Sequence, residues 1–190
     1  MHHNSQKRLQ IPGQTYFLTA KTHQSFPYFR EEILCKLFVA ELEICKKLKK
    51  FELFAFCLNY DHFHLLLRPN AAANISEIMR SLKTNFSRNA NRVINVSTKA
   101  TSRDVAFNKH FEKIKTFCAE FSCKHPPHSF PQFKWQKSFH DHAIRNEKDF
   151  EKHFNYTVNN FRKHGLPEDW KWYSGNFGNL ADEKFLILKK

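Results

Sequence analysis

The sequence lacks the long apolar runs of membrane proteins. No apolar stretch approaches the roughly 20 residues that a helix needs to cross a bilayer. The polar, basic amino terminus over residues 1–12 also lacks the apolar core of a signal peptide. We therefore expect a cytoplasmic protein without a membrane partner, and a length of 190 residues normally forms one domain around one core.

Acidic residues are scarce. The chain has 18 Asp and Glu against 31 Lys and Arg, which gives a formal net charge of +13. Such an excess in a small protein most often reflects a polyanionic partner, and nucleic acid is the first candidate. The alternative explanation of the charge is a generally basic surface, or one that faces a membrane.

Cysteine is present in an odd number, which speaks against a complete set of disulfides. Of the five cysteines, Cys35, Cys45 and Cys57 occupy positions with an apolar pattern. We expect these three to be reduced, buried thiols, in keeping with a cytoplasmic location.

Apolar periodicity predicts alternating strands and helices. Strands are predicted at 14–21, 51–58, 62–68 and 139–144, and helices at 30–50, 74–93 and 146–163. Asn74 with Glu77 and Asn146 are suited to begin the second and third helices. The stretch from 95 to 134 has no clear period and contains three prolines, so we interpret it as a long connection with one short helix near 111–121.

This order of elements indicates an α+β fold. It fits a ferredoxin-like split βαβ sandwich, in which a four-stranded antiparallel sheet is covered by helices. We expect a single domain over 1–190, with an insertion at 96–133 and a carboxy-terminal tail at 166–190. Such a fold serves many unrelated functions, so motifs have to indicate the chemistry.

The first motif is a pair of histidines on a predicted strand. Residues two apart on a strand share a face, so His62 and His64 would lie side by side and could bind one cation. Phe63 and Leu65 would then point into the core. Two histidines facing solvent on a half-exposed strand would give the same pattern.

Tyr156 lies on the last predicted helix, on the side away from its apolar stripe. That stripe consists of Phe150, Phe154, Val158 and Phe161 at about 100° per residue. The side with Tyr156 carries polar and basic residues, namely Lys152, His153, Asn160 and Lys163. This face could handle a phosphate, or it could be a solvated surface.

Three segments together resemble a known family. They are LNYDHFHLLL at 58–67, WQKSFHDHAIRN at 135–146 and YTVNNFRKHG at 156–165. In this order they resemble the HUH endonucleases, named for histidine, hydrophobic residue, histidine, and within them the single-tyrosine, REP-associated transposases. The resemblance implies an enzyme that nicks and rejoins single-stranded, hairpin-containing DNA through a 5′-phosphotyrosine intermediate.

The resemblance also implies roles for individual residues. His62 and His64 would be metal ligands, Tyr156 the nucleophile on the last helix, and Asn160 a third ligand or a polar group beside the metal. The ion would be Mg²⁺ or Mn²⁺, because imidazole ligands favour Mn²⁺ whereas cellular abundance favours Mg²⁺. No organic cofactor is implied, and the likeness favours a monomer over a dimer.

The partner is expected to be single-stranded or hairpin DNA, held by phosphate contacts. The basic residues expected to make them are Arg80, Lys83, Arg88, Arg92, Lys152 and Lys163. The alternative is a non-catalytic or domesticated single-stranded nucleic-acid-binding protein, which would explain the charge and leave the histidines and Tyr156 unused.

Overall fold

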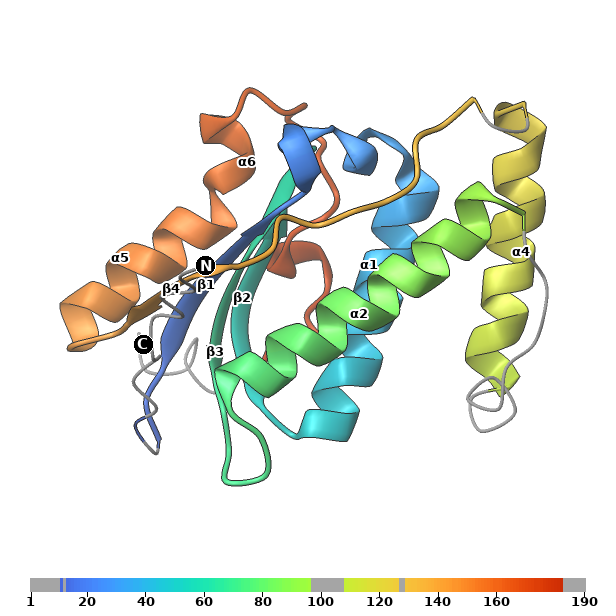
Figure 1. Cartoon of the computed structure of the whole chain (residues 1–190). Coiled ribbons are helices and arrows are strands. Elements are labelled where there is room, and N and C mark those ends of the chain that lie inside the picture. Colours follow the sequence, from blue (N-terminus) through green and yellow to red (C-terminus); the bar gives the residue numbers. More distant parts are fainter. Residues whose placement is uncertain (1–10, 12, 97–107, 127–128, 183–190) are drawn as a thin grey trace, which may run out of the picture.

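A four-stranded antiparallel sheet forms the centre of the computed structural model, which describes residues 11, 13–96, 108–126 and 129–182 (Figure 1). Its strands are β1 (Tyr16–Lys21), β2 (Glu52–Leu58), β3 (His62–Arg68) and β4 (His140–Ala143). They lie in the order β2-β3-β1-β4, and every neighbouring pair is antiparallel. The predicted α+β sandwich is thereby confirmed.

Helices cover both faces of this sheet. On one face lie α1 (Glu32–Lys49) and α2 (Ile75–Ile94), and on the other α5 (Glu147–Val158) and α6 (Asn160–Lys163) (Figure 1). The helix α4 (Asn108–Lys124) packs on the outer side of α1 and α2. Short 3₁₀ turns occur at His23–Ser25, Tyr28–Arg30 and Ser174–Asn176. None of the helices in these described segments is long and apolar enough to span a membrane.

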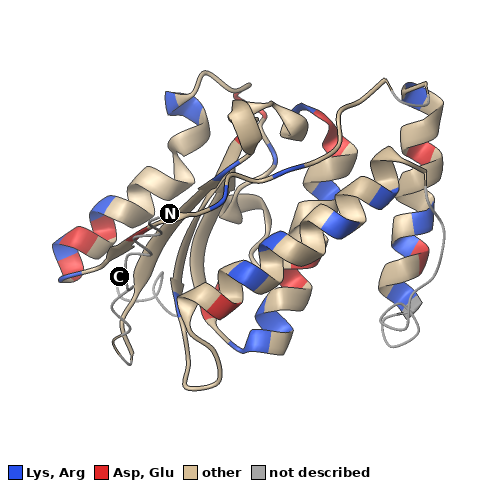
Figure 2. Cartoon of the chain, in the orientation of Figure 1, with Lys and Arg blue, Asp and Glu red and all other residues tan. Residues whose placement is uncertain are grey.

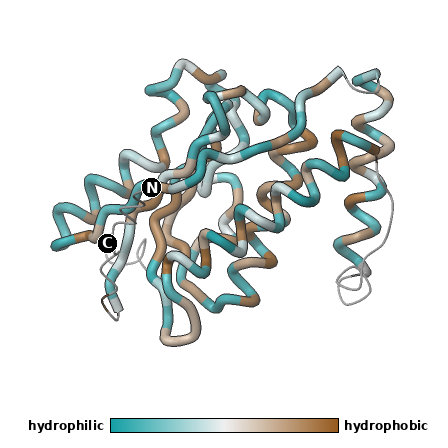
Figure 3. The backbone as a smooth tube through the Cα atoms, viewed as in Figure 1, coloured by the Kyte–Doolittle hydropathy of each residue, from teal (hydrophilic) through white to brown (hydrophobic). Residues whose placement is uncertain are grey.

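The alternation along β3 separates two packing layers. Phe63, Leu65 and Leu67 join the main core with α1 and α2, whereas Leu66 packs against Phe150 of α5. The hydrophobic residues of β2 and β3 accordingly form a continuous apolar centre between the helical layers (Figure 3). Because both faces of β3 are covered, its histidines lie under a helix and do not face solvent.

A capping box fixes the beginning of α2. The Asn74 side chain accepts a hydrogen bond from the backbone N–H of Glu77, and the Glu77 carboxylate accepts one from the backbone N–H of Asn74, both at 3.0 Å. This reciprocal arrangement satisfies two backbone donors that the first turn of a helix leaves unpaired. The predicted start of this helix is confirmed.

The helix α4 is longer and better packed than the short helix predicted at 111–121. It spans 17 residues, and Ile114, Cys118 and Phe121 are buried in the main core. A polar contact adds to this packing, since His110 lies 2.8 Å from the buried carboxylate of Glu41 in α1. The described part of the predicted insertion therefore contributes a third helical layer.

The predicted helix over 146–163 is interrupted. It begins at the predicted cap, where Asn146 accepts from the backbone N–H of Asp149 at 3.0 Å. It ends at Val158, and Asn159 leaves helical geometry with φ −105° and ψ 4°. The Asn155 carbonyl accepts from the backbone N–H of Asn159 at 3.2 Å and from the Asn159 side chain at 2.9 Å, so α5 closes its last turn on this residue.

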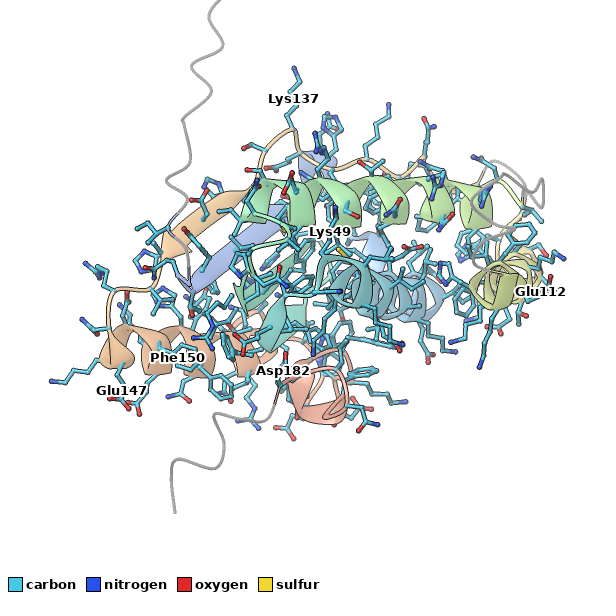
Figure 4. The ribbon with its side chains drawn as sticks, turned by 90° about the horizontal axis from the view of Figure 1, so that it is seen from below. Lys49, Glu112, Lys137, Glu147, Phe150 and Asp182 are labelled. Carbon is cyan, nitrogen blue, oxygen red and sulfur yellow. The ribbon has the colours of Figure 1, made fainter. Side chains whose placement is uncertain are left out.

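This break redirects the residues that follow it. Phe161 packs with Cys57 and Leu166, whereas Phe150 and Phe154 pack in a different cluster. The single stripe predicted for these phenylalanines was therefore wrong beyond the break. At the start of α5, Glu147 points away from the sheet and Phe150 lies over β2 (Figure 4).

The described part of the predicted tail covers the edge strand β2. The backbone N–H of Leu58 donates to the carbonyl of Trp172 at 2.9 Å. Further along, the Asp182 carboxylate accepts from the backbone N–H of Leu53 at 2.8 Å and pairs with Lys46 of α1 at 2.9 Å (Figure 4). These contacts satisfy backbone groups that an open sheet edge would leave exposed.

The predicted buried thiols are confirmed, since Cys35, Cys45 and Cys57 are free and buried.

Candidate active site

The strand register brings the two histidines of β3 together beneath α5 and α6. Their rings lie 4.9 Å apart between centroids and meet edge to face. Each residue is only 4% exposed. The alternation of β3 therefore predicted their common face correctly, and the helices on that face bury them.

His64 is held as a neutral imidazole with one nitrogen left open. Its Nδ1 lies 2.8 Å from the hydroxyl of Thr19, the residue opposite it on β1. Burial, followed by the charges of His62 and His164, lowers the pKa of His64 to about 3 and outweighs the opposing effect of Asn160. Its Nε2 is buried and has no hydrogen-bond partner among the described residues. A neutral ring that donates through Nδ1 keeps a lone pair on Nε2.

Two neighbours orient the ring of His62. Its Nδ1 lies 2.5 Å from the Asp61 carboxylate, and the hydrogen bond from His62 is the main reason that the pKa of Asp61 is lowered. Its Nε2 accepts from the amide nitrogen of Asn59 at 3.1 Å. Metal-binding histidines characteristically donate their second ring N–H to such a carboxylate or other acceptor, which orients the ligand nitrogen.

Asn160 completes a buried polar group around these rings. It is 1% exposed, and its Oδ1 accepts from the Asn59 amide nitrogen at 2.8 Å. The amide nitrogen of Asn59 is thus within hydrogen-bond distance of both His62 Nε2 and Asn160 Oδ1. Within the described chain, the Nδ2 of Asn160 and the Oδ1 of Asn59 are buried without a partner.

Tyr156 packs directly on His64. Their ring centroids are 5.4 Å apart with an edge-to-face geometry, and Phe17 lies against both rings. The ammonium group of Lys163 stands 4.9 Å from the centroid of the tyrosine ring. The cation beside Tyr156 is therefore Lys163. His153, which the sequence placed beside the tyrosine, is hydrogen-bonded to Asp149 one turn earlier.

His164 also belongs to this site, and the sequence analysis missed it. Its ring lies 4.7 Å from that of His62. Burial, followed by the nearby charge of His62, lowers its pKa. It follows the end of α6, so a search confined to one helix face would not find it. The available signal was its position eight residues after Tyr156 within YTVNNFRKHG.

Cys57 lies opposite His64 on β2, but it is not suited to be a ligand. Burial raises the pKa of its thiol to about 12, and it is the thiolate that binds metals and acts as a nucleophile.

The basic residues predicted to contact DNA are divided between the two faces of the molecule. Lys152 and Lys163 are exposed on the helices that cover the histidines, whereas α2 with Arg80 and Arg88 lies on the opposite face of the sheet (Figure 2). The α2 residues therefore do not surround the histidine site.

Two of the α2 residues have structural contacts that the sequence did not indicate. Lys83 donates to the carbonyls of Gln136 at 2.9 Å and Ser138 at 3.0 Å, and so holds the segment before β4. Arg92 is 8% exposed and its guanidinium lies over Phe111 of α4, 5.6 Å from the ring centroid. The prediction that Arg92 lies on a DNA-facing surface does not fit this burial.

Comparison with known proteins identifies the family. The family model described as "Transposase IS200 like" matches residues 14–116, and the chain belongs to this family. A Haemophilus influenzae protein named as a REP-associated tyrosine transposase is 26% identical over 166 residues, which cover 85% of this chain and 80% of that protein. The likeness to single-tyrosine transposases is thereby confirmed.

A solved structure shares the fold. It is that of a REP-associated tyrosine transposase bound to a REP hairpin, with a TM-score of 0.59 and 21% identity. The match covers 90% of this chain and 82% of that chain. The family model ends within α4, so the placement of Tyr156 rests on the geometry described above.

Proposed function

We propose that this transposase nicks and rejoins single-stranded DNA through Tyr156, with a divalent metal held by His62 and His64. The observation that carries the proposal is the packing of Tyr156 on His64, whose buried Nε2 has no partner among the described residues. Membership of the IS200-like family supports this chemistry. The hairpin bound by the structural relative supports single-stranded, hairpin-containing DNA as the substrate. We propose that the protein acts as a monomer.

The residues present fit a cation. His62 Nε2 and Asn160 Oδ1 both accept from the same amide N–H₂ group of Asn59, so a positive dipole already stands between these two acceptors. His62 Nε2, Asn160 Oδ1 and the open Nε2 of His64 would together hold a Mg²⁺ or Mn²⁺ ion in place of this amide group. Two imidazoles and an amide oxygen favour Mn²⁺. When bound, the ion would polarise the scissile phosphate as a Lewis acid.

The covalent step then falls to Tyr156. Its phenolic oxygen would form a bond to phosphorus while the bond from phosphorus to the 3′ oxygen breaks. The phenol loses its proton, the departing 3′ oxygen gains one, and the 5′ phosphate stays on Tyr156 as a diester. Attack by a different 3′ hydroxyl reverses the step and joins a new end without loss of the ester bond.

Two further side chains, the cation Lys163 and the imidazole His164, would assist this transfer. Lys163 places positive charge beside the ring that attacks, where it would stabilise negative charge as it develops. The exposed His164 lies against His62, and we propose that it contacts a DNA phosphate next to the cleaved bond.

A denaturing-gel assay tests the proposal. Purified protein is incubated with labelled single-stranded hairpin DNA from the flanks of its own gene, with Mn²⁺, with Mg²⁺ or with EDTA. We expect a covalent adduct that requires the metal and is lost in Tyr156→Phe and His64→Ala, whereas Tyr156→Phe still binds the DNA. The matched control is Tyr173→Phe, since Tyr173 stacks on Phe161 and not on the histidines.

DNA binding without cleavage would contradict the proposal. If folded wild-type protein binds these strands but forms no adduct and makes no cut with either metal, the nicking mechanism is wrong. The non-catalytic, single-stranded nucleic-acid-binding function would then replace it.

A further inference from the structure

A second cluster of ligand-type side chains joins β4 to α5. His142 Nε2 lies 2.9 Å from Asp149 Oδ2, and His153 Nδ1 lies 3.2 Å from Asp149 Oδ1. The two imidazoles stack at 4.5 Å between centroids. In the part of the chain that the structure describes, this is the one group of three or more His, Cys, Asp or Glu whose ligand atoms all lie within 4.8 Å of one another.

The backbone explains why these side chains meet. Asp149 and His153 are four residues apart on α5, so they share one face of the helix. The same spacing places the two histidines of helical zinc sites side by side. His142 is opposite Phe17 of β1, and Phe17 also packs on His153. His142 on β4 therefore lies on the side of the sheet that faces Asp149 and His153 of α5.

We propose that His142, Asp149 and His153 form a second cation site, selective for Zn²⁺ and chemically similar ions. Two imidazoles and one carboxylate are a ligand set that Zn²⁺ accepts, with ligand distances of about 2.0–2.2 Å in a tetrahedron. Such a tetrahedron separates its ligand atoms by about 3.3 Å. Here His142 lies 2.9 Å from one oxygen of Asp149 and His153 lies 3.2 Å from the other, and one ligand atom of each residue lies within 4.8 Å of the other two. His142 is partly exposed, which leaves the fourth position open to water.

Asp149 is prepared for this role as an anion. It is 7% exposed, and its pKa is held well below the usual range, first by the hydrogen bond with His142 and then by the backbone N–H of Arg145. Such hydrogen bonds to a ligating carboxylate are typical of metal sites. The Arg145 guanidinium, 3.3 Å away, opposes the cation but is largely exposed to solvent, which screens it.

Metal binding would compete with a hydrogen-bonded clamp, by which we mean the contacts of His142 and His153 with Asp149 that hold β4 to α5. His153 Nδ1 also lies 2.8 Å from the carbonyl of Asp149, a contact that a metal would replace. A bound metal would need the lone pair of each of these nitrogens, so the ring proton would have to sit on the other nitrogen.

The proposed second cation site lies on the same helix as Tyr156. His153 precedes Tyr156 by three residues on α5, and Phe17 contacts both rings. A cation between β4 and α5 would fix the helix that carries Tyr156 against the sheet. This consequence depends on the proposed function, whereas the binding site itself does not.

The test uses the full-length protein, stripped with EDTA and titrated with Co²⁺ as a spectroscopic probe and then with Zn²⁺. The double variant His62→Ala/His64→Ala removes the first site, and we expect it to keep one tight Zn²⁺ equivalent, a tetrahedral Co²⁺ absorption band and a rise in Tm. In this background, adding His142→Gln/His153→Gln should weaken Zn²⁺ binding at least tenfold. The matched control is His140→Gln, an exposed histidine of the same strand, which should bind as the wild type does.

In the His62→Ala/His64→Ala protein, equal Zn²⁺ affinity with and without His142→Gln/His153→Gln would overturn the proposal, and so would the absence of a Zn²⁺-dependent rise in Tm. Either result would leave a hydrogen-bonded clamp alone. If the protein with His142→Gln/His153→Gln does not fold, the single change His142→Gln tests the site instead, because the glutamine amide can still donate to Asp149. The Tyr156 adduct assay is independent of these titrations, so either proposal can fail without the other.

Discussion

At the residue scale, Asn59 is the group that organises the histidine site. Its amide nitrogen joins His62 to Asn160, and so connects the end of β2 to the first residue of α6. The sequence separation of Asn59 and Asn160 is 101 residues. Neither residue alone has the spacing of a motif, and their pairing depends on α6 packing beside the end of β2.

The buried state of His64 predicts how stability depends on pH. Its pKa is about 3 in the folded protein and about 6.5 in an unfolded chain. Between these values the unfolded chain binds more protons, so the free energy of unfolding falls as the pH falls. This one group contributes at most about 1.4 kcal/mol per pH unit.

We therefore expect His64→Gln to make the stability of the metal-free protein less sensitive to acid. Urea unfolding in EDTA at about pH 7 and about pH 5 measures this, and the wild type should lose more stability between the two than the variant. Equal losses would mean that His64 titrates normally and is not buried as a neutral ring.

At the element scale, α4 is part of the core. Ile114 is 1% exposed, so Ile114→Ala should lower the free energy of unfolding by about 2–5 kcal/mol through lost burial and a residual cavity. Lys113→Ala, at an exposed position of the same helix, should change it by less than about 0.5 kcal/mol. Chemical denaturation compares the two, and a similar small effect of both would show that α4 does not pack as described.

The break between α5 and α6 was not visible in the periodic pattern of the sequence. A helical period over 146–163 predicts one continuous helix, and no proline or glycine interrupts it before Gly165. The Asn159 side chain only adds a second hydrogen bond to the Asn155 carbonyl, which already accepts from its backbone N–H. After the turn, Asn160 and Phe161 are both buried, and this burial depends on the segments packed around them, which a local period does not describe.

At the scale of the whole molecule, the net charge of +13 is not spread over a single binding surface. Lys152 and Lys163 lie on the face of the histidines, and α2 lies on the other (Figure 2). The affinity for single-stranded DNA at the histidine site should therefore depend on salt through Lys152 and Lys163 and not through the basic residues of α2.

We expect Lys152→Gln/Lys163→Gln to weaken DNA binding and to reduce the slope of log affinity against log salt by about 1.4, since each single-strand phosphate contact contributes about 0.7. Fluorescence anisotropy over a range of NaCl concentrations measures the slope. Lys49→Gln, at the end of α1 (Figure 4), is the control and should leave it unchanged. An unchanged slope in the double variant would place the DNA elsewhere.

The sequence by itself determined the strands, the helices α1 and α2 and the common face of His62 and His64, because these follow from periods of 2 and 3.6 residues along one segment. It also contained the three segments that indicate a tyrosine transposase. Only the tertiary structure decided that the histidines are buried, that Lys163 is the basic residue next to the ring of Tyr156, and that Arg92 packs against α4. Those outcomes depend on which distant segments share a layer, and local periodicity carries no information about that.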